Sequence, residues 1–93
     1  MLLSVKNSSF GMVSSTVLRD PELSLGEKAL YSYLSTYTDS STKETFVSTL
    51  RMASECNIGV STVKRHLQSL EKKGVIARIK RGHGMSSVTK LLK

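Results

Sequence analysis

The fold of this chain of 93 residues is decided by one stretch of its sequence, Ser61-Thr62-Val63-Lys64-Arg65-His66-Leu67-Gln68-Ser69-Leu70-Glu71-Lys72-Lys73-Gly74. The apolar side chains Val63, Leu67 and Leu70 recur at the spacing of one helical face. Ser61 has the side-chain oxygen of an N-cap residue, and Gly74 can take the left-handed conformation that ends a helix. We therefore predict an amphipathic helix over about residues 61–73.

The other side of this helix is rich in hydrogen-bond donors. It carries Thr62, Lys64, Arg65, Gln68 and Ser69, which are all hydrogen-bond donors and none of which is acidic. A helix that is apolar on one side and donor-rich on the other is suited to lie against an anionic partner.

The positive charge of the chain is concentrated around this helix. The net charge is +7. Residues 1–46 contain four basic and five acidic side chains, whereas residues 47–93 contain ten basic and two acidic ones. This asymmetry favours a polyanionic partner, although charge alone does not separate DNA, RNA and acidic membranes.

A second helix is predicted just before the first. Ser48 provides its N-cap, and Leu50, Met52 and Ala53 are expected to face inward before the helix ends near Cys56. The next four residues, 57–60, form the turn between the two helices.

Within that turn, Asn57 or Gly59 can take the positive φ that a sharp change of direction requires. Ile58 and Val60 are expected to fill the angle between the helices. Two helices joined in this way, with the second one cationic, form a helix-turn-helix arrangement.

A basic β-hairpin is predicted to follow. Residues 75–79 read as a strand with Arg78 pointing outward, and residues 87–91 can return as its antiparallel partner. The connection between them is Lys80-Arg81-Gly82-His83-Gly84, which is glycine-flanked and strongly basic. The order of helix, turn, helix and hairpin is that of a winged helix.

The N-terminal half is predicted to supply supporting helices. Ser24 and Glu27 match a capping box that opens a helix over about residues 25–38. We expect its core stripe at Leu30, Tyr33, Leu34 and Tyr37. A single helical turn is expected over residues 14–19, an exposed loop over 38–45 and a very short strand at 46–47.

The chain is predicted to form one domain over residues 10–93, with the helix-turn-helix at about 48–73 and the wing at about 75–92. Residues 1–9 form an N-terminal arm, for which an edge strand and a frayed segment both remain open.

Several classes of protein are excluded by what the sequence lacks. Cys56 is the single cysteine, so there is no disulfide framework, and we expect it to be a small buried side chain in a protein of the reducing cytoplasm. No segment resembles a signal peptide or a membrane span. No phosphate-binding glycine loop, paired carboxylates or metal-ligand cluster is visible, so we expect neither catalysis nor a cofactor.

Residues 48–81 resemble the winged helix-turn-helix domains of bacterial and phage DNA-binding proteins. The resemblance is carried by residues in a characteristic order, Val47-Ser48, Leu50, Ala53, Ile58-Gly59-Val60-Ser61-Thr62-Val63, Leu67, Leu70, Gly74 and Ile76-Ala77-Arg78. It implies a fold that is mainly α with a small β-hairpin wing.

The upstream part is similar to one branch of these domains, found in plasmid replication initiators, phage replisome organisers and small transcription regulators. The similar residues are Phe10-Gly11-Met12-Val13, Val17-Leu18, Asp20, Leu23-Ser24 and Lys28-Ala29-Leu30-Tyr31. Because one domain serves all three roles, the resemblance indicates the fold more specifically than the biological role.

The resemblance implies that the helix at about 61–73 enters the major groove of duplex DNA. Arg65 is the first candidate for a base contact, because its planar guanidinium can bind guanine O6 and N7 together. The other base-contact candidates are Ser61, Thr62, Gln68 and Ser69.

A second group of residues is expected to contact phosphates, which gives affinity rather than sequence choice. Its members are Ser48, Thr49, Lys64, Lys72, Arg78, Lys80, Arg81 and His83. For Arg81, insertion into the minor groove is an alternative. His66 either flanks the DNA backbone or packs at the rim of the core.

We therefore expect a non-enzymatic protein of the bacterial cytoplasm, or one encoded by a phage or plasmid, that binds double-stranded DNA as a transcription regulator. The DNA-binding module of a replication initiator or replisome organiser is the alternative. A winged helix that docks an acidic protein is a rival from another class, and RNA binding is disfavoured by the scarcity of aromatic residues. A homodimer, protein partners in a replication or transcription complex, and a longer parent chain stay open.

Overall fold

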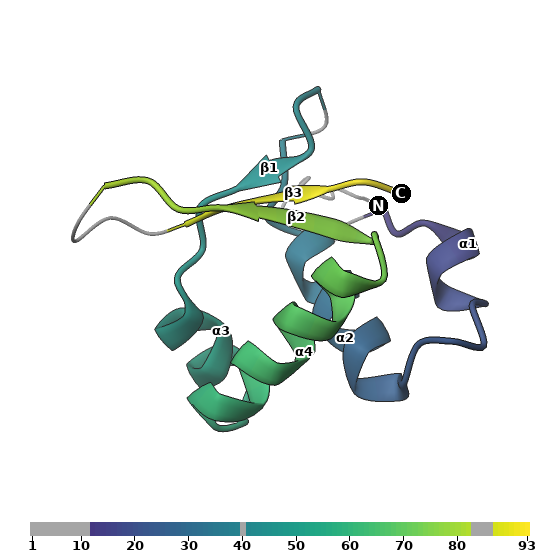
Figure 1. Ribbon diagram of the computed structural model, residues 1–93, viewed down its shortest axis with the longest axis horizontal. Helices are drawn as coiled ribbons and strands as arrows, with labels where there is room; N and C mark the ends of the chain where they lie inside the picture. The colour runs from purple at the N-terminus through teal and green to yellow at the C-terminus, as the bar shows by residue number, and fades with distance from the viewer. Residues whose placement is uncertain (1–11, 40, 83–86) are drawn as a thin grey trace, which may run out of the picture.

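The computed structural model describes residues 12–39, 41–82 and 87–93, in which helices on one side are covered by a small sheet on the other (Figure 1). The elements in chain order are α1 (Ser15–Leu18), α2 (Leu25–Ser35), β1 (Glu44–Thr45), α3 (Thr49–Cys56), α4 (Val60–Lys72), β2 (Ile76–Ile79) and β3 (Val88–Leu91). The fold is a winged helix-turn-helix of the α+β class, as predicted. The N-terminal arm and His83 lie outside the described residues.

The sheet is antiparallel and three-stranded, in the order β1-β3-β2. The predicted hairpin pairs Ile76 with Leu91 and Ile79 with Val88. The short strand predicted at residues 46–47 is wrong by two positions, since β1 consists of Glu44 and Thr45. This strand exists because it pairs with β3, a long-range contact that a local pattern does not reveal.

The core lies between the helices and the inner face of the sheet. The stripe predicted for α4 is confirmed, because Val63, Leu67 and Leu70 are almost fully buried. They pack with buried residues from the other elements, Leu30, Tyr31, Leu34, Met52, Ile76 and Leu91. Burial of side chains of this size stabilises a fold by about 1.5–3 kcal/mol each, so this core fixes α4 firmly.

The start of α4 differs from the prediction. Its N-cap is Gly59, which has extended backbone angles and provides no side-chain hydrogen bond, so Ser61 as N-cap is wrong. The predicted end is confirmed: Gly74 has φ +76, and the backbone N–H groups of Gly74 and Val75 donate to Glu71 and Leu70 carbonyls. These two hydrogen bonds together form a Schellman motif, which ends α4 and turns the chain toward β2.

The preceding helix, α3, begins as predicted with the Ser48 side chain accepting a hydrogen bond from the Arg51 backbone N–H. Asn57 supplies the left-handed residue of the turn, with φ 58. Met52 and Ala53 are buried, but Leu50 is 70% exposed, so its predicted place in the core is wrong. Leu50 lies two positions before Met52, which turns it about 200° away from it around the helix.

The capping box of α2 is confirmed, but the helix ends at Ser35 rather than 38. Two of the predicted core tyrosines are not buried: Tyr33, inside α2, packs only at the core's margin, and Tyr37, beyond the end of the helix, is exposed. Both hydroxyls donate to Glu55 Oε1, at 2.6 and 2.7 Å. Tyr31, which was not part of the predicted stripe, is the tyrosine that is fully buried.

The single helical turn predicted over residues 14–19 is present as α1. Ser14 is its N-cap, and Val17 is its buried residue. α1 lies near the C-terminal end of the described chain, at the opposite end of the molecule from residues 80–82, which follow β2 (Figure 1).

Candidate nucleic-acid interface

One side of α4 is fastened to α2 through a buried carboxylate. Glu27, which is only 6% exposed, accepts hydrogen bonds from the Ser24 backbone N–H at 2.8 Å and from Lys73 Nζ at 3.1 Å. Lys73 Nζ also donates to the Glu22 carbonyl at 2.6 Å, and the Ser69 hydroxyl bonds to Glu27 as well. Burial raises the pKa of Glu27, but these bonds and the Lys73 charge outweigh it and bring the pKa to about 2.

A close approach of backbone and side chain reinforces this contact. The His66 imidazole lies against Gly26 in the first turn of α2, where a Cβ would stand 2.7 Å from Nε2. His66 is half-buried at this place. Of the two positions considered for it, beside a DNA backbone or at the rim of the core, the structure has the second. The side of α4 that carries His66, Ser69 and Lys73 is therefore occupied by α2.

The outermost line of α4 is an exposed ridge of donor side chains. Ser61, Arg65, Gln68 and Lys72 are all exposed and follow one another at intervals of three and four residues. This spacing places them on one face, opposite the buried stripe. We call these four residues the α4 ridge.

Beside the ridge lies a cleft of about 600 Å³ between α4, the start of α3 and the wing. It is lined by Ser48, Thr49, Lys64, Leu67, Gln68, Glu71, Arg78, Lys80 and Ser87. Among the described residues of this lining, three are cations and one is a carboxylate. The cleft is therefore an electropositive hollow that adjoins the ridge through Gln68.

Arg78 forms part of the inner wall of the cleft. Its predicted outward orientation is wrong, because residue 78 pairs with Thr89 in the sheet and its Nε donates to the Thr89 hydroxyl at 3.0 Å. The guanidinium is half-buried, and this burial lowers its pKa while the negative charge of Glu71 acts to raise it. A guanidinium held in place by one hydrogen bond retains further donors for an anion in the cleft.

The structure gathers most of the predicted contact residues on one side of the molecule. Ser61, Arg65, Gln68 and Lys72 form the ridge, whereas the cleft collects Ser48, Thr49, Lys64, Arg78 and Lys80. Thr62 is half-buried in the first turn of α4. Ser69 is half-buried on the side of α4 that faces α2, where its hydroxyl interacts with the Glu27 carboxylate, so it lies apart from the ridge and the cleft.

The wing contributes one more cation with a defined position. The Arg81 guanidinium stacks over the Phe46 ring, with its Cζ 4.8 Å from the ring centroid. Phe46 is 53% exposed and was not singled out from the sequence as a contact of the wing. The stacking fixes the direction in which Arg81 leaves β2.

Two members of the cleft were missed by the sequence reading. Glu71 and Ser87 line the cleft, although neither was proposed as a site residue. For Glu71 the signal was available, since Lys64, Gln68 and Glu71 follow one another at helical spacing. Ser87 is brought there only by the pairing of β3 with β2.

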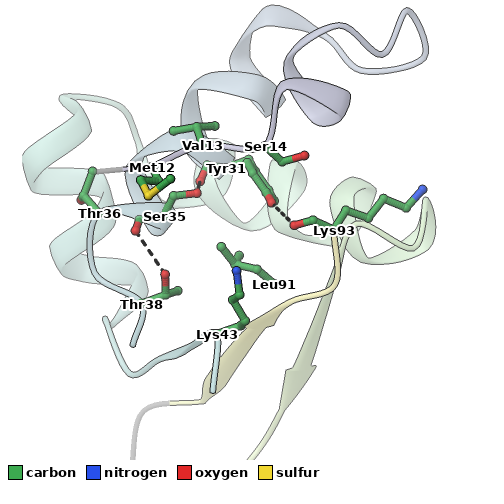
Figure 2. A pocket seen from close by; sticks show the side chains of 10 residues that line it. All are labelled: Met12, Val13, Ser14, Tyr31, Ser35, Thr36, Thr38, Lys43, Leu91 and Lys93. Atoms are coloured by element: carbon green, nitrogen blue, oxygen red, sulfur yellow. Dashed lines mark hydrogen bonds between the residues drawn. The ribbon is translucent and has the colours of Figure 1, made fainter. Parts of the chain in front are cut away.

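A second hollow, of about 470 Å³, lies elsewhere in the fold (Figure 2). It is enclosed by the end of α2, the segment before α1 and the end of β3, with Tyr31, Lys43 and Leu91 among its walls. It shares no residue with the ridge or the cleft. The Tyr31 hydroxyl donates to the Lys93 carbonyl across its edge, which ties the end of β3 to α2.

Other kinds of site find no support in the described part of the chain. Within it, histidine, cysteine and acidic residues form no group of three that could hold a metal ion. Cys56 is a half-buried free thiol that packs against the core, and burial raises its pKa. None of the helices over residues 12–39, 41–82 and 87–93 has both the length and the apolarity of a membrane span.

The fold and this surface define a winged helix-turn-helix protein in which the second helix of the motif, α4, exposes a row of donor side chains. In comparison with protein families, residues 22–76 match the model of the helix-turn-helix domain family, from just before α2 to the first residue of β2. The chain belongs to this family, and a helix-turn-helix domain suggests DNA binding. Searches among curated proteins and among solved structures find no match.

Proposed function

We propose that the protein binds double-stranded DNA, with α4 in the major groove and the wing and the start of α3 on the backbone, and that it acts as a transcription regulator. The observation that carries this proposal is the α4 ridge. Its four residues are exposed donors, on a helix whose opposite side is fixed by the core. A rigid helix with such a face fits the width and the hydrogen-bond pattern of the major groove.

Base selection is assigned to the ridge. Arg65 lies in its middle, where a guanidinium can make paired hydrogen bonds to guanine and contribute about 1–3 kcal/mol of discrimination. Gln68 follows one turn later and can bind adenine in the same paired manner. Ser61, in the first turn of α4, is close to the helix end that enters the groove, and Thr62 beside it remains a candidate for a base edge or a phosphate.

Backbone binding is assigned to the cleft and the wing. Lys64, Arg78 and Lys80 surround the cleft, and Arg81 continues the same charge along the wing. Hydroxyl groups at the start of α3 add neutral donors, beside a helix N-terminus that itself favours an anion. Contacts of this kind set the register of a protein on DNA without reading its sequence.

Titration of the chain with random duplex DNA at several salt concentrations tests the proposal. We expect the logarithm of the binding constant to fall linearly with the logarithm of salt, with a slope of about −0.9 for each phosphate contacted. The double variant Lys64→Ala with Lys80→Ala should lose two phosphate contacts and so make the slope shallower by about 1.8.

Arg19→Ala is the control, because it removes an exposed cation next to α1, which lies at the opposite end of the molecule from residues 80–82 after β2. It should leave the slope almost unchanged. If the chain fails to bind duplex DNA at low salt but captures an acidic protein, the interaction module takes the place of our proposal.

A replication initiator or replisome organiser that uses the same domain is the alternative biological role. Selection of bound sequences from a random library gives the target, and a reporter gene placed behind that target separates the roles. We expect expression of the reporter to change with the protein. If the target leaves transcription unaffected but allows a plasmid to replicate, the protein acts in replication initiation instead of transcription.

A further inference from the structure

Glu71 is an acidic residue in an otherwise cationic surface. It belongs to the side of α4 that carries Lys64 and Gln68, and it lines the same cleft as Arg78. Only one other acidic residue is found in residues 47–93, and that residue, Glu55, is bound by Tyr33, Tyr37 and Arg51. Glu71, by contrast, makes no side-chain hydrogen bond or ion pair with any residue that the structure describes.

The position of Glu71 is unfavourable for the helix itself. It lies in the last turn of α4, where the carbonyl ends of the helix dipole carry partial negative charge. A carboxylate there is unfavourable, whereas the lysines that follow it are favourable. Helix formation therefore gives no reason for an acid at this place.

The electrostatic partner of Glu71 is Arg78. Their charges interact across the cleft, although they form no direct ion pair within the 4.0 Å of a salt bridge among the described residues. Arg78 is held on the other side by the Thr89 hydroxyl. The guanidinium thus has a neutral hydrogen-bond acceptor in Thr89 and feels the negative charge of Glu71, at the wall of the hollow where we place the DNA backbone.

We propose that Glu71 limits the affinity of the cleft for DNA phosphates by repelling them and by competing with them for Arg78. The inference rests on the proposed function and concerns the regulation of the same site. Because a phosphate carries no base information, the restraint acts equally on every sequence. It lowers the backbone contribution to binding and leaves base selection to the α4 ridge.

Glu71→Gln tests this inference, because it keeps the shape of the side chain and removes the charge. We expect its affinity for random duplex DNA to rise about threefold to tenfold at low salt. The salt slope should steepen by about 0.9, the contribution of one additional phosphate contact. Sequence preferences selected from a library should be the same as those of the parent chain.

Two further variants make the test specific. Glu22→Gln removes one exposed carboxylate near the start of α2 and matches the change in net charge, so it should raise affinity by much less. Arg78→Gln removes the partner, and in that background Glu71→Gln should gain clearly less than in the parent chain. Circular dichroism confirms that each variant is folded before it is titrated.

The outcomes separate the two proposals. Absence of duplex binding by the parent chain would overturn both of them. Duplex binding with an unchanged or lower affinity of Glu71→Gln would overturn the restraint alone. A changed base preference in Glu71→Gln would also overturn it, because the carboxylate would then contact a base, such as the cytosine amino group.

Discussion

At the scale of single residues, Glu27 joins the beginning of α2 to the end of α4 through one carboxylate. Its Oε1 accepts a hydrogen bond from the Ser24 backbone N–H and also forms a salt bridge with Lys73 Nζ. The bond from Ser69 adds a third partner. The orientation of α4 therefore depends on a residue that lies outside both the ridge and the cleft.

Stability should depend on pH through this residue. The pKa of Glu27 is about 2 in the folded protein, against 4.5 for an ordinary glutamate. Because the folded-state pKa is lowered, the stabilisation is fully present above pH 4.5 and is lost as the pH falls through about 2. We expect Glu27→Gln to lower the free energy of unfolding at pH 7 by about 1–3 kcal/mol and to weaken this acid dependence.

Urea unfolding between pH 2 and 7 measures both effects. Glu22→Gln, which changes an exposed carboxylate nearby, should cost much less at every pH. Equal costs for the two variants would mean that the contact of Glu27 with Lys73 and Ser69 contributes nothing particular to stability.

Arg65 and Lys64 are neighbours in sequence for which we predict different effects on binding. Arg65→Ala should lose about 1–3 kcal/mol for the selected target and relax the base preference at one position. Lys64→Ala should weaken binding to all sequences by a similar factor. It should also make the salt slope shallower by about 0.9, the contribution of one phosphate contact. Binding assays on the target and on single-base variants of it distinguish these patterns; identical patterns for both variants would remove base reading from Arg65.

At the scale of elements, the end of α4 depends on one glycine. Gly74 has φ +76, and nothing lies within 4 Å of the place where a Cβ would be built. The cost of Gly74→Ala should therefore come from backbone strain alone, about 1 kcal/mol. We expect a corresponding loss in the free energy of unfolding by urea, with binding to DNA retained under conditions where the protein is folded.

Gly59→Ala is the comparison for that measurement. Gly59 also has open space around it, but its φ is −72, which any residue adopts. Its substitution should cost less than that of Gly74. The reverse order would show that the left-handed conformation at the end of α4 is not what limits this position.

The helix-turn-helix and the wing were predictable as elements, because periodicity, caps and turn residues agree along residues 48–91. One strand and one helix start were placed wrongly, for different reasons. β1 is only two residues long and is defined by its pairing with β3. The start of α4 was misplaced because its N-cap, Gly59, adopts the required backbone angles without any side-chain signal.

At the scale of the whole molecule, the excess of basic residues in the second half of the sequence places positive charge on the surface formed by the ridge and the cleft. The ridge and the cleft take most of their residues from the second half of the chain, while the first half supplies α1 and α2 behind them. The sequence predicted that the helix now seen as α4 is buried along Val63, Leu67 and Leu70 and exposes donor side chains on its other side. It did not predict that Ser69 and Arg78 turn inward or that Glu71 lines the cleft, because these depend on how α2 and the sheet pack on α4.

The central claim is that the α4 ridge, the cleft and the wing together form the surface that contacts DNA. Backbone amide chemical shifts, recorded as duplex DNA is added to the protein, test it most directly. We expect the largest changes over residues 48–49, 61–72 and 78–81, with little change in α1 and around Tyr31. Changes centred on the second hollow or on α1, or no changes at low salt, would contradict the account.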